Sequence, residues 1–369
     1  MKTERIYFPG LNGLRTIASL GVVFCHTTNA LSGFGLDSYI FGKQDDGNPK
    51  STLLAGFGVS IFFALSGFLI TYLLLAEQKQ TNAVNIKNFY IRRALRIWPL
   101  YYLYLILSVS TLFYFNIDFN FNVVYDYLFL FPNIPFVLGT PIMFLTHYWS
   151  LGVEEQFYAF WPWVVRKKKN PLKIVLVLFT IFLVLKFSSK FMEIKYGIDF
   201  PYQFLSTTRF DCMMIGAMAA ILLFQENTIF KKITTHFLTQ LISWGALLAL
   251  TFNMFHFASI IDQELVSLIT VCLIMGQIAP KPLISLEYPW FDFLGKISYG
   301  VYVIHLLLIF YLPLIIKPSG YGIWDYILVY FSVYFCTILC AYISYNFFEK
   351  KVMNYKEKYT IVKSFSSKT

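Results

Sequence analysis

The sequence predicts an all-α polytopic membrane protein with about ten transmembrane helices and both termini on the cytoplasmic side. Three observations lead to this prediction. Of the 369 residues, 57% are hydrophobic and only 14% are charged, whereas a soluble domain is roughly 25% charged. Long apolar runs recur from one end of the chain to the other, and a spanning helix needs about 20 such residues. The basic residues gather in alternate connections between these runs.

Ten apolar segments are long enough, or nearly so, to cross a bilayer. In chain order they cover residues 14–29, 53–75, 95–115, 146–165, 172–188, 205–223, 238–257, 260–279, 293–314 and 324–348. Residues 126–131 are also apolar, but the run is short and two prolines follow, so we expect an interfacial segment. The predicted organisation is one transmembrane domain over residues 1–349 and a short basic cytoplasmic tail over residues 350–369.

The distribution of basic residues sets the predicted orientation. With the N-terminus inside, an even number of spans leaves most of the 30 Lys and Arg residues in cytoplasmic connections, including Arg92, Arg93, Arg96 and residues 166–169. This is the positive-inside pattern, so the net charge of +10 is attributed to topology. Nucleic-acid binding is disfavoured, because the charges do not gather on one soluble unit. We expect a multi-pass protein of the plasma membrane.

The first apolar segment carries two residues that are costly in a membrane, Arg15 and His26. They are eleven residues apart, close to three helical turns, so they share one face and are separated by roughly 16 Å of rise. Arg15 is then at the cytoplasmic edge and His26 in the outer half. Each also has an ordinary interpretation: a topology-setting charge for Arg15, and a histidine bonded to a neighbouring helix for His26.

Three arginines enter the third segment from the cytoplasm. Arg92 and Arg96 are four residues apart, and Arg93 and Arg96 are three apart, so the side chains are close on a helix. Three like charges repel one another unless an anion neutralises them. Lipid headgroups are one such anion, and a bound phosphate is the other, for which the guanidinium fork is well shaped.

The fourth segment opens with a motif that contains two adjacent glutamates. His147 and Glu154 are seven residues apart and nearly on one face, whereas Glu155 points elsewhere. Two carboxylates inside an apolar helix are costly, which indicates a functional or site-supporting role. Trp149 and Ser150 belong to the same motif. Trp149 suits either stacking on a sugar or, as the default interpretation, anchoring at the membrane interface.

Polar residues also enter the sixth and ninth segments. Arg209 and Asp211 are two residues apart and face different ways, so each is expected to have a partner on another helix, structural or functional. Ser298, Tyr302 and His305 form one polar stripe at helical spacing. A buried, hydrogen-bonded histidine is the ordinary interpretation of His305, and a catalytic one is the alternative.

Taken together, these residues form two groups. The arginines Arg15, Arg93 and Arg96 lie at the cytoplasmic face, whereas His26, His147, Glu154, Arg209 and His305 lie at the midplane or in the outer half. A group of arginines on the cytoplasmic side suits the binding of an anionic donor from the cytoplasm. The histidines and carboxylates deeper in the membrane suit its reaction with a group on the other side.

The segments resemble, in order and spacing, the type-3 family of integral-membrane acyltransferases, which includes bacterial O-acetyltransferases of surface polysaccharides. The resemblance rests on six segments: residues 11–15 with His26; 58–71; Arg93 and Arg96 with Pro99; 147–158 with Trp161 and Pro162; 209–211 with Gly216; and 294–299 with Tyr302 and His305. One departure is at Glu349, which Lys350 and Lys351 follow where the family commonly has a nearby proline.

The resemblance implies an acyl-CoA donor, such as acetyl-CoA, bound from the cytoplasm by Arg15, Arg93 and Arg96. It implies transfer to a hydroxyl of a carbohydrate or lipid-linked glycan outside, with His26 as the catalytic histidine. Base catalysis by His26 is our hypothesis, and an acyl-histidine intermediate is the alternative. Neither a metal nor a tightly bound cofactor is expected; acyl-CoA is a co-substrate.

Further roles are assigned to the surrounding residues as hypotheses. Glu154 or Glu155 orients an imidazole or holds the acceptor. Oxyanion or sugar hydrogen bonds come from Arg209, Tyr302 or His147. Trp149, Ser150, Asp211 and His305 support the site or the acceptor.

Two other functions fit part of the sequence. A transporter or exporter of glycans or lipid-linked intermediates would also have ten spans and buried charges, but no internal repeat halves are visible. A membrane sensor or scaffold would leave the buried Glu154–Glu155 pair unexplained. Consumption of acyl-CoA in the presence of an acceptor discriminates among the three.

Overall fold

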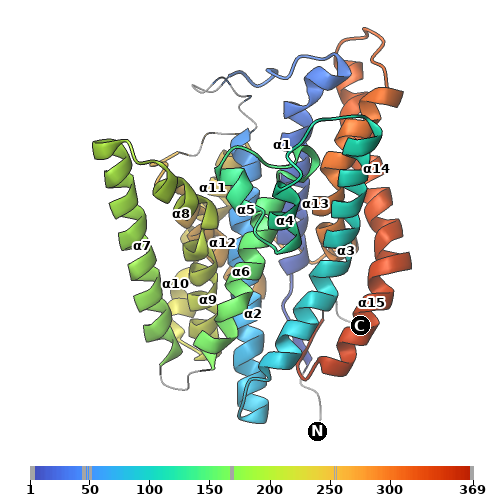
Figure 1. Cartoon of the computed structure of the whole chain (residues 1–369). Helices are drawn as coiled ribbons and strands as arrows, with labels where there is room; N and C mark the ends of the chain where they lie inside the picture. Colours follow the sequence, from blue (N-terminus) through green and yellow to red (C-terminus); the bar gives the residue numbers. More distant parts are fainter. Residues whose placement is uncertain are drawn as a thin grey trace.

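The computed structural model describes residues 5–43, 47, 49, 52–166, 170–252, 254 and 256–365. This part of the chain consists of helices and one two-stranded sheet (Figure 1). The two strands are β1 (Arg5–Tyr7) and β2 (Lys363–Phe365). The longer helices are α1 (Leu11–Asn29), α2 (Thr52–Thr81), α3 (Ile86–Tyr114), α6 (Tyr148–Val165), α7 (Pro171–Tyr196), α8 (Phe200–Thr208), α9 (Phe210–Phe224), α11 (Phe237–Thr251), α12 (Asp262–Ile278), α13 (Pro289–Ile315) and α14 (Ile323–Ser344).

Shorter helices connect these elements. They are η1 (Leu31–Phe34), α4 (Val123–Leu128), α5 (Asn133–Val137), η2 (Met143–Leu145), α10 (Thr228–Thr234), a π-helical turn η3 (Tyr345–Glu349), α15 (Lys350–Lys356) and η4 (Glu357–Tyr359). The segment expected at the interface, 126–131, begins in α4 and ends before α5. Some positions named in the sequence predictions lie outside the described residues: 167–169, 253, 255 and the tail positions 366–369.

Each of the ten apolar segments overlaps a helix, although 205–223 is divided between α8 and α9 and 238–257 extends beyond the end of α11. Fewer helices meet a strict test of length and hydropathy. In the described part of the chain, six helical stretches are long and apolar enough to cross a membrane, or seven if the bent pair α10–α11 is one span. The helices α1 and α6 carry the polar residues that interrupt an apolar run, and α12 has only 17 residues. A multi-pass membrane architecture is therefore supported, and the count of ten stays a prediction.

Local signals set several helix ends. The Asn85 side chain accepts a hydrogen bond from the Asn88 amide at 2.9 Å and caps the start of α3. Pro171 opens α7, where its missing N–H costs nothing. Gly197 ends the same helix in the left-handed region, at φ 68°.

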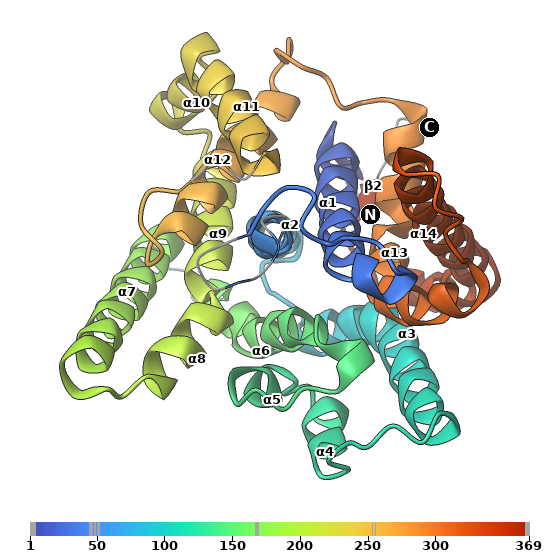
Figure 2. The same ribbon diagram turned by 90° about the horizontal axis from the view of Figure 1, so that it is seen from above.

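The helix α2 lies at the centre of the bundle. Seen from above, the other helices surround it (Figure 2), and it packs against α1, α6, α9 and α12. Within its apolar stretch 72% of the residues are buried, against 22% for α7 and for the stretch that begins with α14. The outward faces of those two peripheral helices expose Ile181, Val184, Phe331 and Phe335, as expected for surfaces that contact lipid.

Glycines allow the helices that carry the site to approach closely. A Cβ atom at Gly216 of α9 would lie 2.0 Å from the Ala64 carbonyl oxygen of α2. A Cβ atom at Gly295 of α13 would lie 2.5 Å from the backbone oxygen of Asn12 in α1. Since a glycine has no Cβ, the backbones pack directly against one another. These contacts fix α1 relative to α13, and α2 relative to α9.

Replacement of Gly295 by alanine is expected to destabilise the fold by about 1–3 kcal/mol, because the added methyl group overpacks the α1–α13 contact. The measurement is the thermal unfolding midpoint of the purified protein in detergent. Gly245→Ala in α11 is the matched control, since a Cβ there meets nothing within 4 Å. Equal midpoints for the two variants would contradict the close contact.

The two ends of the described chain are joined at one end of the bundle. Strand β1 pairs in parallel with β2, with Ile6 opposite Ser364. Helix α15 packs against α3, and Arg92 of α3 donates a hydrogen bond to the Tyr359 carbonyl at 2.7 Å. Arg92 also forms an ion pair with the buried Glu77 of α2 at 2.7 Å. The tail that follows α14 is therefore packed onto the helices rather than separate from them.

Candidate active site

Two of the predicted site histidines are in direct contact. His26 of α1 and His305 of α13 are 279 residues apart in sequence, yet Nδ1 of His26 lies 2.7 Å from Nε2 of His305. Their rings are nearly parallel, at 4°. His305 is fully buried and His26 is half-buried. The close packing of α1 on α13 thus brings together two residues that the sequence could only place at similar depth.

The hydrogen bonds define which nitrogen carries each proton. Nδ1 of His305 lies 2.6 Å from the Tyr302 carbonyl oxygen, which can only accept, so this nitrogen is the donor. Nε2 of the neutral His305 ring is then an acceptor, and His26 donates to it from Nδ1. This leaves a lone pair on Nε2 of His26, which has no hydrogen bond to any described residue. His305 therefore holds His26 in the tautomer that a general base requires.

His147 is the third histidine of this group. Its ring lies 4.9 Å from the ring of His305, and its Nε2 donates to the Val303 carbonyl at 3.2 Å. The Nδ1 atom is consequently an acceptor, and it is buried with no hydrogen-bond partner among the described residues. We call His26, His147 and His305 the histidine group.

A hydroxyl pair supports the histidine group. Tyr302 and Ser150 lie 2.7 Å apart through their hydroxyl oxygens, and both are within 3.1 Å of the His147 carbonyl oxygen. Each hydroxyl has one proton, so one donates to the carbonyl and the other to its neighbour. The pair fixes the start of α6 against α13.

Arg209 lies beside Trp149 on the side of the site formed by α2 and α9. Its guanidinium carbon is 5.0 Å from the Trp149 ring centroid, a cation–π contact. Nη1 donates to the Gly56 carbonyl at 2.9 Å and contacts the side chains of Ser60 and Gln263. Arg209 adopts a left-handed conformation, with φ 44°, at the break between α8 and α9.

Asp211 belongs to a different cluster. It is fully buried and lies 3.4 Å from the ammonium group of Lys186, which is 2.6 Å from Glu264. This cluster joins α7, α9 and α12. Asp211 has the partner on another helix that the sequence predicts, and the contact is one that holds helices together.

The adjacent glutamates have partners other than His26. Glu154 accepts from the Tyr158 hydroxyl at 3.3 Å, and Glu155 accepts from the Trp98 indole at 2.8 Å. Tyr158 in turn bonds to Ser66 of α2. The structure therefore puts His305, rather than either glutamate, in contact with the imidazole of His26.

The three arginines that the sequence analysis expects at the cytoplasmic side lie near one another in the structure. Arg15, Arg93 and Arg96 act electrostatically on one another; we call them the cation cluster. Arg93 lies over the Tyr158 ring at 5.4 Å, and its Nε is buried without a hydrogen-bond partner in the described chain. Glu154 lies within electrostatic range of Arg15 and Arg93. Glu154 and Tyr158 thus border the cation cluster.

Glu349 also faces the cation cluster. It is the residue that two lysines follow where the family commonly has a nearby proline. It is buried, accepts a hydrogen bond from Ser344 at 3.2 Å and lies within electrostatic range of Arg96. The π-helical turn η3 carries it toward α13, where its carboxylate approaches the position of a Cβ at Gly300.

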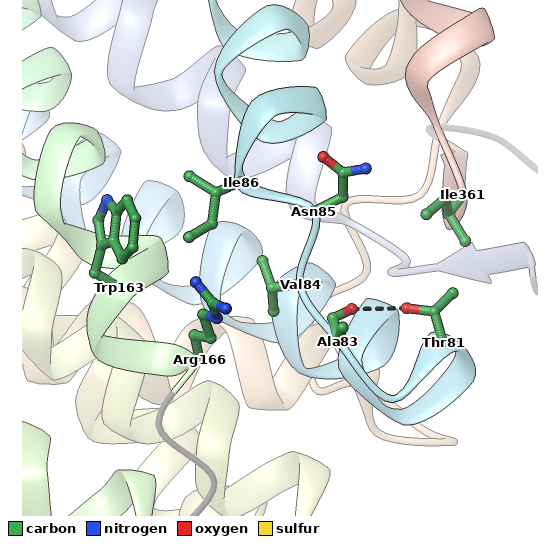
Figure 3. Close-up of a pocket in the computed structure, with 8 residues that line it drawn as sticks. All are labelled: Thr81, Ala83, Val84, Asn85, Ile86, Trp163, Arg166 and Ile361. Carbon is green, nitrogen blue, oxygen red and sulfur yellow. Dashed lines mark hydrogen bonds between the residues drawn. The ribbon is translucent and has the colours of Figure 1, made fainter.

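A cavity of about 500 Å³ lies near the sheet formed by β1 and β2, since Ile361, just before β2, is one of its lining residues. It lies between the α2–α3 connection, the end of α6 and Ile361 of the tail, and Trp163 and Arg166 form one wall (Figure 3). Its lining contains none of the predicted site residues. Trp163 donates a hydrogen bond to the Tyr90 hydroxyl at 3.0 Å, which connects this wall to the start of α3.

Residues 8–346 match the family described as an acyltransferase domain. This chain therefore belongs to the type-3 acyltransferase family. Two relatives, the O-acetyltransferase OatA of Staphylococcus aureus strains NCTC 8325 and COL, are each 27% identical over 94% of this chain. The protein SAR0937 of Staphylococcus aureus strain MRSA252 is 26% identical over 96% of this chain.

The match covers only part of these relatives. The chain spans 57% of the length of either OatA and 59% of SAR0937. No solved structure matches the chain.

Proposed function

We propose that this protein transfers an acyl group, acetyl in the first instance, from cytoplasmic acyl-CoA to a hydroxyl of a carbohydrate or lipid-linked glycan at the outer side of the plasma membrane. Membership of an acyltransferase family and similarity to proteins named O-acetyltransferases support the reaction class. They favour acyl transfer over the alternative of a transporter.

The observation that carries the proposal is the free lone pair on Nε2 of His26. The contact from His26 to His305, and from His305 to the Tyr302 carbonyl, fixes the ring and leaves that nitrogen available. A base held in one orientation and one tautomer is what proton removal from a hydroxyl requires.

The proposed reaction proceeds in one displacement. Nε2 of His26 removes the proton of the acceptor hydroxyl while its oxygen attacks the thioester carbonyl carbon. The tetrahedral oxyanion collapses, the C–S bond breaks, and the proton on His26 passes to the departing thiolate. The products are an ester and free CoA. In the acyl-histidine alternative, Nε2 itself attacks the thioester first.

Three neighbouring residues have separable roles in this proposal. Arg209 carries a fixed charge beside Trp149 and can stabilise the oxyanion. The Tyr302 hydroxyl can do so when its proton turns away from Ser150 or the His147 carbonyl. His147 presents an acceptor nitrogen, so it suits a substrate hydroxyl better than an oxyanion.

The experiment that tests sidedness uses proteoliposomes with acetyl-labelled acetyl-CoA enclosed and short oligosaccharides outside. Because the protein inserts both ways round, the enclosed donor selects molecules with the cation cluster facing the lumen. We expect label on the external oligosaccharide. Transfer only when donor and acceptor are mixed on one side would contradict movement across the membrane, and intact acetyl-CoA under all conditions would contradict the donor.

A further inference from the structure

The tail that follows α14 contributes a cation to the site formed by the arginines. Lys356, the last residue of α15, lies within electrostatic range of Arg96, Arg93, Arg92 and Arg15. The packing of α15 on α3 (Figure 1) and the hydrogen bond from Arg92 to the Tyr359 carbonyl place it there. The pairing of β2 with β1 holds the other end of the described tail against the N-terminal strand.

The positive charge at this position exceeds the negative charge. Among the described residues, Lys356 forms no ion pair with a carboxylate. The buried carboxylate of Glu77 is paired with Arg92. Glu349 faces Arg96 but accepts its hydrogen bond from Ser344. Glu154 lies within electrostatic range of Arg15 and Arg93, and Glu155 lies within range of Arg93. In the described part of the chain, the four cations Arg15, Arg93, Arg96 and Lys356 thus face the three carboxylates Glu154, Glu155 and Glu349, which leaves the positive charge in excess.

Like charges withdrawn from water repel one another, and a bound anion relieves that repulsion. The natural anion for a mixed group of arginines and a lysine is phosphate, which arginine contacts through two parallel hydrogen bonds and lysine contacts as a point charge. A phosphate monoester carries about −1.5 to −2 charge, and the diphosphate of CoA adds further negative charge. The excess positive charge of the four cations is therefore complementary to the negative charge of the CoA phosphates.

We propose that Lys356 is a donor-binding residue and that α15, packed on α3, closes the phosphate site of the cation cluster. The inference rests on the proposed function, because acyl-CoA supplies the phosphates. It gives the segment after residue 349 a direct part in binding, beyond that of a basic cytoplasmic tail.

The test compares acetyl-CoA affinity of wild type, Lys356→Gln and Lys356→Arg by calorimetry in a neutral detergent. Lys356→Gln is expected to weaken binding about tenfold, the loss of one hydrogen bond to a charged group, and to reduce the dependence of affinity on salt. Lys356→Arg keeps the charge and is expected to restore most of the affinity. Lys351→Gln, an exposed lysine on the same helix, is the matched control.

The outcomes separate this inference from the function on which it rests. Wild-type binding that Lys356→Gln leaves unchanged overturns the role of Lys356 and leaves the donor in place. No wild-type binding of acetyl-CoA overturns both. A third outcome concerns lipid: phosphatidylglycerol added to the detergent competes with acetyl-CoA in wild type but not in Lys356→Gln, and Lys356→Gln binds acetyl-CoA normally. In that case the lysine holds a lipid headgroup, and the inference is overturned.

Discussion

His26→Ala is expected to abolish acyl transfer while the protein is still expressed and folded. Removal of a general base costs about 10²–10⁴-fold in rate, and an alanine at position 26 leaves no nitrogen where Nε2 lies. The measurement is release of CoA from acetyl-CoA in the presence of an acceptor. Loss of the small contact with His305 leaves the α1–α13 packing in place, so the unfolding midpoint should change little.

Two variants make this result specific. His236→Ala removes an exposed histidine at the start of α11 and should leave the rate unchanged. His305→Gln retains a side-chain oxygen that can accept from Nδ1 of His26, so it should keep more activity than His305→Leu. Activity of His26→Ala near that of wild type would exclude His26 as base and as nucleophile alike.

Arg93→Ala/Arg96→Ala is expected to weaken acetyl-CoA binding by about 100-fold or more. The two guanidinium groups each supply hydrogen bonds to charged phosphate oxygens, and each such bond is worth about tenfold in affinity. Arg93 has a buried Nε that no described residue accepts from, which leaves it available to a ligand. Isothermal calorimetry with acetyl-CoA measures the effect directly.

The matched control is Lys350→Ala/Lys351→Ala, which removes two exposed charges from the same end of the molecule. If this control weakened binding as strongly as the arginine variant, the effect would be one of overall charge. Unchanged binding in the arginine variant would place the donor elsewhere, and the cavity beside Trp163 and Arg166 would then be the first position to examine.

Much of this architecture could be predicted because a bilayer restricts the possible structures. Apolar runs must be helices in a membrane, so the positions of the helices could be predicted from composition and spacing. The separation of Arg15 and His26 along α1 follows from helical rise alone. The family resemblance identified the same residues, and the family match over residues 8–346 confirms it.

Contacts between helices could not be predicted in the same way. Spacing gives a residue's face and depth, but not which distant helix meets that face. The contact between His26 and His305 depends on Gly295, where α13 meets the backbone of α1. The ion cluster of Lys186, Asp211 and Glu264 comes from three separate helices. Lys356 carried no signal beyond that of an ordinary basic tail.

The contact between the first helix and the late helix α13 has a consequence for biosynthesis. Helix α1 is made first, but His305 is made 279 residues after His26, which at about 5–20 residues per second is roughly 15–60 s later. During that interval His26 is in the nascent chain without its partner His305. A truncated chain would never acquire α13, β2 or Lys356, so its first helix would keep a costly polar side chain without the partner that it has in the complete fold.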